Sequence, residues 1–253
     1  MKPINIHAVI LVVFLMSGLL NAKEIKIAVA ANVSYAIKPL IKAFSQSHPE
    51  TKVNVILGSS GKLLAQITHG APYALFMSAN MKYPNRLYQN GMTVGKPVIY
   101  AQGALAMLSK KERDYSMGLE VLSSEDIRKI AIANPKTAPY GVAAAEALKN
   151  AKLYKKLEKK FVYGESISQT VIYATKAADI GLVALSSLYA PQMVHYKKSI
   201  HWVEVNEALY TPINQGMVIL KHAKENHEVK AFYDFMLSPK AKEILQSFGY
   251  RVK

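Results

Sequence analysis

The stretch Val55-Ile56-Leu57-Gly58-Ser59-Ser60-Gly61-Lys62-Leu63-Leu64 changes from the residue spacing of a β-strand to that of an α-helix. Apolar residues alternate up to Leu57 and then recur with helical spacing from Leu63 to Ile67. The Gly-Ser-Ser-Gly segment between them predicts a tight turn and a helix N-terminus. The first N–H groups of a helix lack intrahelical partners and carry partial positive charge, so this turn is suited to an anion. Its two hydroxyls are donors, and its glycines would let a bound anion come close to the backbone. Most serine turns of this kind are simple N-caps, so one turn alone does not establish a site.

Three further turns of this kind follow predicted strands. Residues 24–30 alternate as a strand and lead into a turn at 31–34. The strands at 127–133 and 161–163 lead into turns at 134–141 and 164–168. Repeated strand–turn–helix units predict parallel strands joined by crossover helices. Open α/β sheets bind ligands at the carboxyl ends of their strands, so the four turns are expected to meet at one site.

The order of the elements predicts an α/β protein with two lobes, each a mostly parallel sheet flanked by helices. Two turns precede an apolar stretch near residue 100 and two follow it, which suits a hinged clamshell with its ligand in the interlobe cleft. We expect one lobe at 23–100 plus 212–253 and the other at 101–211. The remaining predicted elements are a short buried strand within 71–79, helices at 83–91, 142–151 and 169–177, a charged continuation of the second of these helices over 152–160, strands at 179–185 and 216–220, a weak strand at 201–206, and a helix pair at 228–248.

Composition narrows the class of protein. The 253 residues are 51% hydrophobic, which supplies ample core and argues against global disorder. Cysteine is absent, which excludes disulfides, thiolate metal sites, cysteine nucleophiles and a lipoprotein anchor. The formal net charge of +15 is spread over scattered lysines without interleaved aromatic residues. We interpret it as a solvated basic surface that also favours the capture of anions, and we expect no nucleic acid partner.

The N-terminal residues 1–22 are predicted to be a secretory signal peptide. Lys2 precedes an apolar run from Ala8 to Leu20, and Ala22 is a small residue before a polar stretch. The run is too short for a permanent membrane span. We therefore expect cleavage near Ala22 and a mature protein that is exported to the periplasm.

The four turns offer mostly uncharged donors. They hold hydroxyls, one amide and backbone N–H groups, together with one lysine, Lys136, and one acid, Glu165. Hydrogen bonds to a charged group contribute about 1.5–3 kcal/mol each, so neutral donors alone can hold a dehydrated anion. A pocket of donors favours a fully deprotonated oxyanion, although the amide oxygen of Asn32 could accept from a protonated one. Glu165 is expected to point to solvent or to a lysine.

At these turns the chain resembles the periplasmic molybdate-binding proteins of ABC transporters, often called ModA. The resemblance covers essentially the whole mature chain, and its motifs are specific in combination rather than singly. They are Ala30-Ala31-Asn32, Gly58-Ser59-Ser60-Gly61, Gly70-Ala71-Pro72 with Phe76-Met77-Ser78-Ala79, Asn134-Pro135 with Ala138-Pro139-Tyr140-Gly141, Asp179-Ile180-Gly181-Leu182-Val183-Ala184, and Ala231-Phe232-Tyr233-Asp234-Phe235-Met236.

The resemblance implies a type II periplasmic binding protein that holds molybdate or tungstate between its lobes, without direct protein–metal ligands or a cofactor. It implies delivery to an ABC permease, and we expect a monomer. Some family members have a tyrosine where this chain has Ala184. Ser59 belongs to the candidate set and is expected to cap or support its turn. The implied ligand residues are Ser60 through its hydroxyl and N–H, Ala31 and Asn32 or alternatively Ser34 in the first turn, and Tyr140 and Ile167 through their backbone N–H groups.

Two other functions stay open. A cleft enzyme would need a general acid or base, and the candidate turns contain no histidine and a single acid, Glu165. We therefore expect no enzyme activity. A binding protein of the same fold for sulfate or thiosulfate differs mainly in cavity size, which sequence does not give. A ferric site would want tyrosinate, histidine and carboxylate together, and no such cluster is evident in the sequence.

Overall fold

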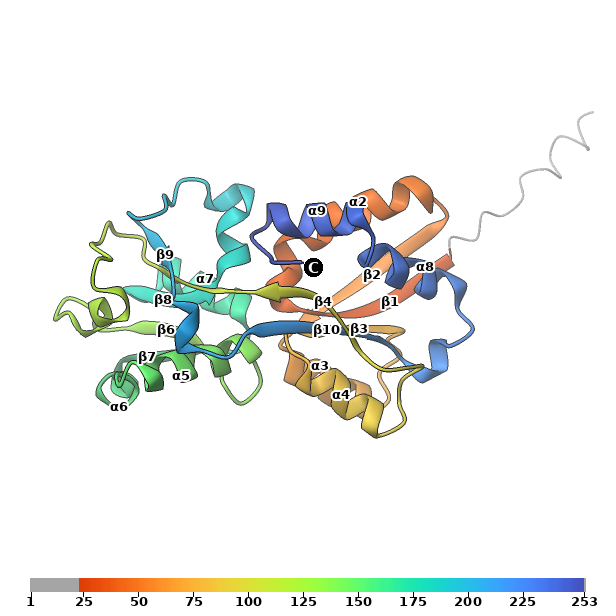
Figure 1. Cartoon of the computed structure of the whole chain (residues 1–253), viewed down its shortest axis with the longest axis horizontal. Coiled ribbons are helices and arrows are strands. Elements are labelled where there is room, and N and C mark those ends of the chain that lie inside the picture. Colours follow the sequence, from red (N-terminus) through yellow and green to blue (C-terminus); the bar gives the residue numbers. More distant parts are fainter. Residues whose placement is uncertain (1–22, 253) are drawn as a thin grey trace, which may run out of the picture.

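A computed structural model describes residues 23–252, and the predicted signal peptide at 1–22 lies outside the described residues. The described chain forms two α/β lobes that lie side by side (Figure 1). Each lobe contains one five-stranded sheet with helices on both faces, which confirms the predicted two-lobed α/β fold. Within residues 23–252, no helix combines the length and apolar character needed to cross a bilayer.

The strands are short, and most of them are buried. They are β1 (Lys23–Ala30), β2 (Thr51–Gly58), β3 (Leu75–Met77), β4 (Val98–Gly103), β5 (Leu105–Leu108), β6 (Ile130–Ala133), β7 (Phe161–Gly164), β8 (Ile180–Ala184), β9 (Trp202–Glu204) and β10 (Ile213–Ile219).

The helices mostly follow strands and cover the sheets. The α-helices are α2 (Ile37–Ser47), α3 (Ser60–Thr68), α4 (Lys82–Gln89), α5 (Pro139–Asn150), α6 (Tyr154–Leu157), α7 (Ile167–Lys176), α8 (His227–Met236) and α9 (Pro239–Ser247). The 3-10 helices are η1 (Ala31–Tyr35), η2 (Gly118–Ser123), η3 (Glu158–Lys160), η4 (Leu185–Tyr189), η5 (Pro191–Met193), η6 (Glu207–Leu209) and η7 (Lys221–Ala223).

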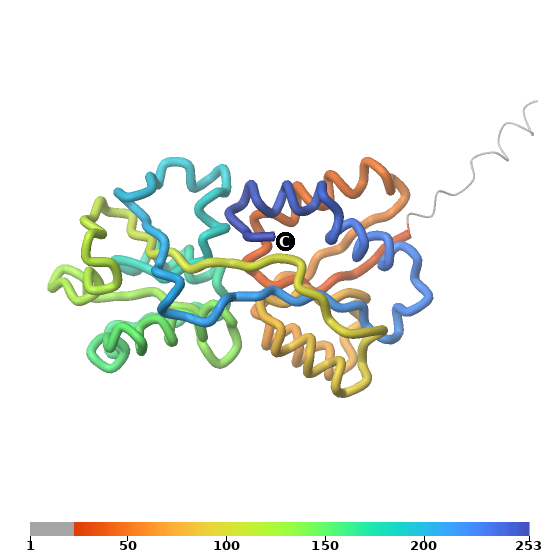
Figure 2. The backbone as a smooth tube through the Cα atoms, in the orientation of Figure 1, coloured from red at the N-terminus to blue at the C-terminus, as the bar shows by residue number. Residues whose placement is uncertain are grey.

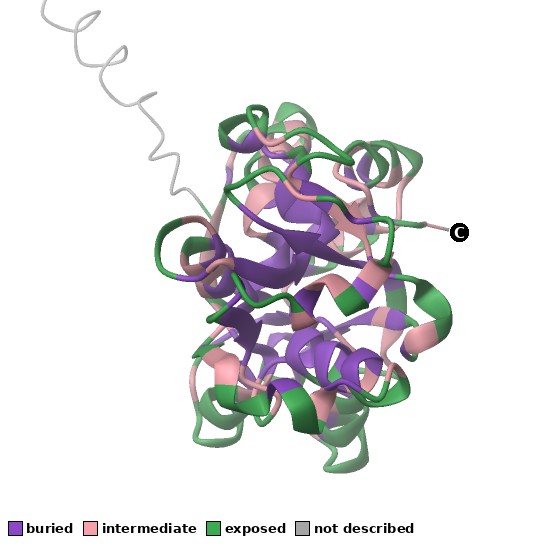
Figure 3. Cartoon of the chain, turned by 90° about the vertical axis from the view of Figure 1, so that its left-hand side faces the viewer, coloured by how far each residue is buried: buried purple, intermediate pink, exposed green. Residues whose placement is uncertain are grey.

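The sheet of the first lobe has the strand order β2-β1-β3-β10-β4. Strand β1 is parallel to β2 and β3, whereas β10 is antiparallel to β3 and β4. The alternation of β1 places Ile25, Ile27 and Val29 in the core under α2, α8 and α9, and Ala28 in the core under α3. Figure 3 views the molecule from the side of the second lobe, where buried strands likewise lie between partly exposed helices.

The sheet of the second lobe has the order β7-β6-β8-β5-β9 and repeats this plan. Strand β6 is parallel to β7 and β8, whereas β5 is antiparallel to β8 and β9. Half of the pairings in each sheet are antiparallel, so the sheets are mixed rather than mostly parallel. The reason is the two-lobed connectivity, because a chain that leaves one lobe along β4 returns along β10 in the opposite direction.

Two segments of chain join the lobes. Strand β4 pairs in the first sheet up to Gly103, and β5 pairs in the second from Leu105, so the chain changes sheets at Ala104. It returns between Glu204 of β9 and Ile213 of β10 (Figure 2). The lobe boundaries at 100/101 and 211/212 stay a prediction.

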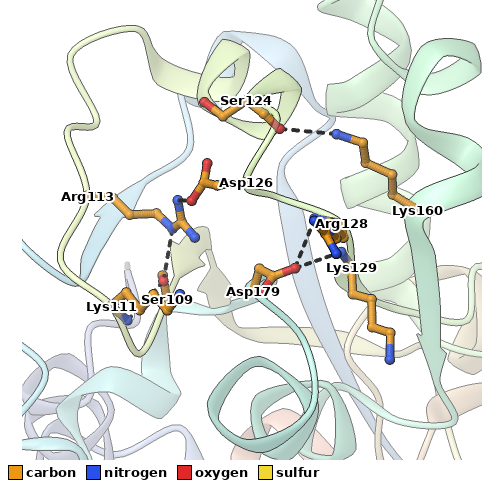
Figure 4. A network of polar contacts seen from close by, with 9 residues as sticks. All are labelled: Ser109, Lys111, Arg113, Ser124, Asp126, Arg128, Lys129, Lys160 and Asp179. Carbon is orange, nitrogen blue, oxygen red and sulfur yellow. Dashed lines mark hydrogen bonds and ion pairs between the residues drawn. The ribbon is translucent and has the colours of Figure 1, made fainter.

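Two local predictions differ from the structure. The helix expected to continue over 152–160 is interrupted, because Lys152 adopts a left-handed φ of 59° and α6 and η3 follow separately. This break turns Leu153 and Leu157 into the core. The strand expected at 127–133 begins only at Ile130, because the Asp179 carboxylate accepts hydrogen bonds from the N–H groups of Arg128 and Lys129, both at 2.9 Å (Figure 4).

Candidate functional site

A small cavity lies between the lobes, where β1 and β2 of the first lobe and β6 and β7 of the second reach their carboxyl ends. The volume open to the centre of a water molecule is about 10 Å³, so the cavity has room for about one water molecule. Its lining contains no charged side chain. The lining residues are Ala30, Ala31, Asn32, Gly58, Ser59, Ser60, Ala79, Ala138, Pro139, Tyr140 and Ile167.

Six of the seven candidate residues are therefore brought together from four separate segments. Ala31, Asn32, Ser59, Ser60, Tyr140 and Ile167 are all buried. Ser34 is half-buried and lies outside the lining. The first turn thus presents Ala31 and Asn32 to the cavity.

Three helices begin at this cavity. Ser60 is the first residue of α3, Tyr140 follows the initial proline of α5, and Ile167 is the first residue of α7. In the described chain the backbone N–H groups of these three residues have no hydrogen-bond partner. Helix dipoles add partial positive charge at such ends, so the cavity is electropositive although no cation lines it.

The two serines of the Gly-Ser-Ser-Gly turn differ in their contacts. The Ser60 Oγ accepts a hydrogen bond from the Ala79 N–H at 2.9 Å, so its own hydrogen stays free to donate. The Ser59 Oγ is buried and has no partner in the described chain. Ser59 occupies the N-cap position of α3 without any side-chain cap bond, so of the two expected roles, capping or supporting the turn, the structure excludes capping. Its hydroxyl is a second unused donor in the cavity lining.

Asn32 is held from behind the cavity. Its Nδ2 donates to the Gln215 Oε1 and to the Tyr250 hydroxyl, both at 2.9 Å. The Tyr250 hydroxyl donates back to the Asn32 carbonyl oxygen at 2.9 Å, and Ser186 of the second lobe donates to the same oxygen at 3.2 Å. Both amide hydrogens of Asn32 are thus engaged, and its Oδ1 is buried without a partner in the described residues.

The Tyr140 hydroxyl lies in the region where the lobes join, beside Gln215 and Gly103. Its hydroxyl accepts a hydrogen bond from the Gln215 Nε2 at 3.2 Å. A Cβ at Gly103 would lie 2.0 Å from this hydroxyl, so only glycine fits there. Burial raises the pKa of Tyr140 well above its usual value, so the hydroxyl keeps its proton. For an anion, Tyr140 therefore offers only its backbone N–H.

The lobes touch each other around the cavity. The Gly61 N–H donates to the Thr137 carbonyl oxygen at 2.9 Å, and Lys62 forms an ion pair with Glu165. This pair agrees with the expectation that Glu165 points to a lysine. A Cβ at Gly61 would lie 2.9 Å from the Thr137 carbonyl oxygen. The absence of a side chain at Gly61 therefore allows close contact with the second lobe, rather than with an anion.

Sequence reasoning missed five lining residues and the polar network behind them. Ala30, Gly58, Ala79, Ala138 and Pro139 lie within or beside the quoted motifs but carry no polar side chain to single them out. Gln215 left one signal, as a polar residue next to the apolar run of strand β10, and it is fully buried there. Ala184, at the position where some family members have a tyrosine, is buried and supplies no hydroxyl. Within residues 23–252, no group of three or more His, Asp or Glu side chains could hold a metal ion.

Two mixed α/β lobes joined by crossing segments, with an uncharged cavity at the strand ends, define a two-lobed solute-binding protein. The sequence profile of the bacterial extracellular solute-binding proteins matches residues 25–251. The molybdate-binding proteins ModA of Rhodobacter capsulatus and Azotobacter vinelandii are each 37% identical to this chain. The first alignment covers 90% of this chain and 88% of the relative, and the second covers 95% and 96%. The solved periplasmic molybdate-binding protein of Azotobacter vinelandii superposes with a TM-score of 0.83 at 33% identity, covering 90% of this chain and 99% of that one.

The chain belongs to the bacterial extracellular solute-binding proteins and, among them, to the ModA family. This family consists of transport proteins rather than enzymes, which confirms the prediction that the chain is not an enzyme.

Proposed function

We propose that the protein captures molybdate, and also tungstate, in the cavity between its lobes. The observation that carries the proposal is the convergence of three helix N-termini and two unused serine hydroxyls on a small cavity without charged lining. The hydrogen-bonding capacity of the lining suits a dianion, because its unused N–H and O–H hydrogens find no acceptor in the described part of the protein. The relatives named as molybdate-binding proteins support the choice of oxyanion. No cofactor is needed.

The proposed ligand set follows the lining. Ser60 donates through its hydroxyl and N–H, and Ser59 donates through its hydroxyl. Tyr140 and Ile167 donate through their N–H groups. Ala31 and Asn32 are the ligand residues of the first turn. Five to seven bonds of about 1.5–3 kcal/mol each, less the costs of association, give roughly micromolar affinity or better. Phosphate would bury an O–H that meets mostly donors, at a cost of about 1–3 kcal/mol.

Export and delivery complete the proposal. We propose that the signal peptide at 1–22 is removed near Ala22, so that the mature protein works as a monomer in the periplasm. A relative described as periplasmic supports this location. The ligand is then passed to the membrane permease of an ABC transporter, the class of partner that the ModA relatives imply.

A panel of oxyanions tests the function. Purified residues 23–253 are titrated by calorimetry with molybdate, tungstate, sulfate and phosphate, and the thermal midpoint is recorded with each. Molybdate and tungstate are expected to raise the midpoint, and sulfate and phosphate to leave it unchanged. A larger shift with sulfate than with molybdate contradicts the ligand assignment and favours the sulfate alternative.

A further inference from the structure

Gln215 lies at the centre of a buried polar network behind the cavity and is not one of the lining residues. Its Oε1 accepts from the Asn32 Nδ2 and from the Tyr100 hydroxyl, both at 2.9 Å. Its Nε2 donates to the Tyr140 hydroxyl at 3.2 Å. All four side chains are buried, and they come from η1, β4, α5 and β10. The amide of Gln215 therefore connects the cavity residue Asn32 to both lobes.

In this arrangement Asn32 presents its amide oxygen, an acceptor, to the cavity, although a fully deprotonated anion needs donors. Its nitrogen is turned to Gln215 and Tyr250, so the unpartnered Oδ1 is the atom left for the cavity. A carbonyl oxygen repels an oxyanion that has only acceptors. It would suit an oxyanion that still carries a proton and can donate it.

A coupled turn of the two amides gives the opposite arrangement at the cost of one hydrogen bond, because the Tyr250 hydroxyl has a single hydrogen and can donate it either to the Asn32 carbonyl oxygen or to the turned Asn32 Oδ1. The oxygen and nitrogen of an amide have nearly the same shape, and each hydroxyl can either donate or accept. With both amides turned, the Gln215 nitrogen donates to the Asn32 oxygen and to Tyr100, and Tyr140 donates to the Gln215 oxygen. The Asn32 NH2 then faces the cavity. Burial raises the pKa of both tyrosines well above the usual value, so their hydroxyls keep the hydrogens that the exchange requires.

We propose that Gln215 is a specificity-determining positioning residue, because its amide sets which end of the Asn32 amide faces the bound oxyanion. A fully deprotonated oxyanion selects the turned arrangement, and a protonated one selects the arrangement with Oδ1 in the cavity. The inference rests on the proposed function, so molybdate binding by the unmodified protein is measured first. Failure of that measurement contradicts the function, whereas the variants below test the role of Gln215.

The substitution Gln215→Glu fixes the direction of the network. The new carboxylate only accepts, so it holds the Asn32 nitrogen and leaves the Asn32 oxygen for the cavity. The probes are molybdate and hydrogen phosphate at mildly alkaline pH, titrated directly or by competition. Both are dianions, so repulsion by the added charge affects them alike. We expect the ratio of molybdate affinity to hydrogen phosphate affinity to fall at least tenfold.

The matched control is Gln102→Glu, the same chemical change on the neighbouring strand β4, where Gln102 is outside the cavity lining. It is expected to change the ratio less than twofold. Far-UV circular dichroism and the thermal midpoint establish that each variant is folded. A ratio in Gln215→Glu that stays within twofold of the unmodified protein overturns the proposal.

Two conservative variants keep the test decisive if Gln215→Glu does not fold. Tyr100→Phe removes the second acceptor of the Gln215 nitrogen in the turned arrangement, so the ratio is expected to fall about threefold. Tyr140→Phe leaves the Gln215 nitrogen without an acceptor in the arrangement that places the Asn32 Oδ1 in the cavity. In the turned arrangement it leaves only the Gln215 carbonyl oxygen without a donor. A buried N–H without a partner is more costly than a buried carbonyl without one, so the ratio is expected to rise. Opposite shifts support the coupled turn. Shifts in the same direction, or none, show a structural role only and overturn it.

Discussion

The two ends of β6 carry opposite kinds of polar chemistry. Before the strand, Asp179 accepts from the Arg128 and Lys129 N–H groups, and the Arg113 Nη1 pairs with the Asp126 Oδ2 at 2.8 Å (Figure 4). After the strand, the cavity is lined by neutral groups whose hydrogens have no acceptor. At the first end carboxylates accept hydrogen bonds from donors of the protein itself, whereas at the second end several donors meet no acceptor in the described residues. The comparison indicates that the first end stabilises the fold and that the second awaits an anion from outside.

The largest expected effect comes from placing a charge in the neutral end. Ser60→Asp puts a carboxylate where the anion would lie, and at an effective dielectric of about 20 repulsion at contact distance exceeds roughly 3 kcal/mol. Calorimetry should therefore detect no molybdate binding in the micromolar range. An aspartate is favourable in the first turn of a helix, so the thermal midpoint without ligand should not fall. Binding that survives the added carboxylate would place the site elsewhere.

Removing one neutral donor is expected to have a smaller effect. Ser60→Ala deletes a hydroxyl that is buried in the cavity, and molybdate affinity should fall by about 1.5–3 kcal/mol. Ser34→Ala is the matched control, since Ser34 follows the first strand but lies outside the lining. Its affinity should equal that of the unmodified protein. Equal losses in the two variants would contradict the assignment of the first turn to Ala31 and Asn32.

The charged end should respond in stability rather than in binding. Burial by itself raises the pKa of Asp179, but the N–H groups of Lys129 and Arg128, with Arg113 and Lys111, lower it overall. Its carboxylate therefore stabilises the fold at neutral pH, and this contribution is lost as the pH falls below the ordinary aspartate value of 3.8. Asp179→Asn should lower the free energy of unfolding by about 1 kcal/mol at pH 7.

Denaturant unfolding at several pH values checks this prediction for Asp179. The difference between the variant and the unmodified protein should disappear in acid, and molybdate affinity at pH 7 should be unaffected. A difference that persists at low pH would point to packing instead of charge.

The smallest effect is expected where an ion pair bridges the lobes. Lys62 and Glu165 are about half exposed, and such pairs contribute roughly 0–1 kcal/mol. Lys62→Ala should weaken molybdate binding less than about fivefold, by removing a contact between the lobes. The loss should vanish at high salt, because exposed charges are screened. Titrations at two ionic strengths distinguish this from a direct contact with the anion, which would give a larger loss.

Much of the fold was predictable because its signals are local. The strand–turn–helix spacing around residues 51–67 and the apolar alternation of β1 depend on near neighbours in the chain. The break at Lys152 was not predictable from composition, since the surrounding lysines are good helix formers. The need to bury Leu153 and Leu157 in the core overrode that propensity. The antiparallel pairing of β10 likewise follows from where the chain returns, which no local pattern records.

By itself the sequence determined that four turns follow strands and precede helices, and that they carry mostly neutral donors. These features rest on residue spacing and on the hydrogen-bonding capacity of side chains. The tertiary structure alone decided which of these groups face the cavity. Asn32 and Gln215 are 183 positions apart, and their hydrogen bond exists only because β1 ends where β10 begins, in the region where the lobes join. Hydrogen bonds depend on ångström-scale placement by packing, so the Ser59 hydroxyl could be recognised as an unused donor only once the fold was known.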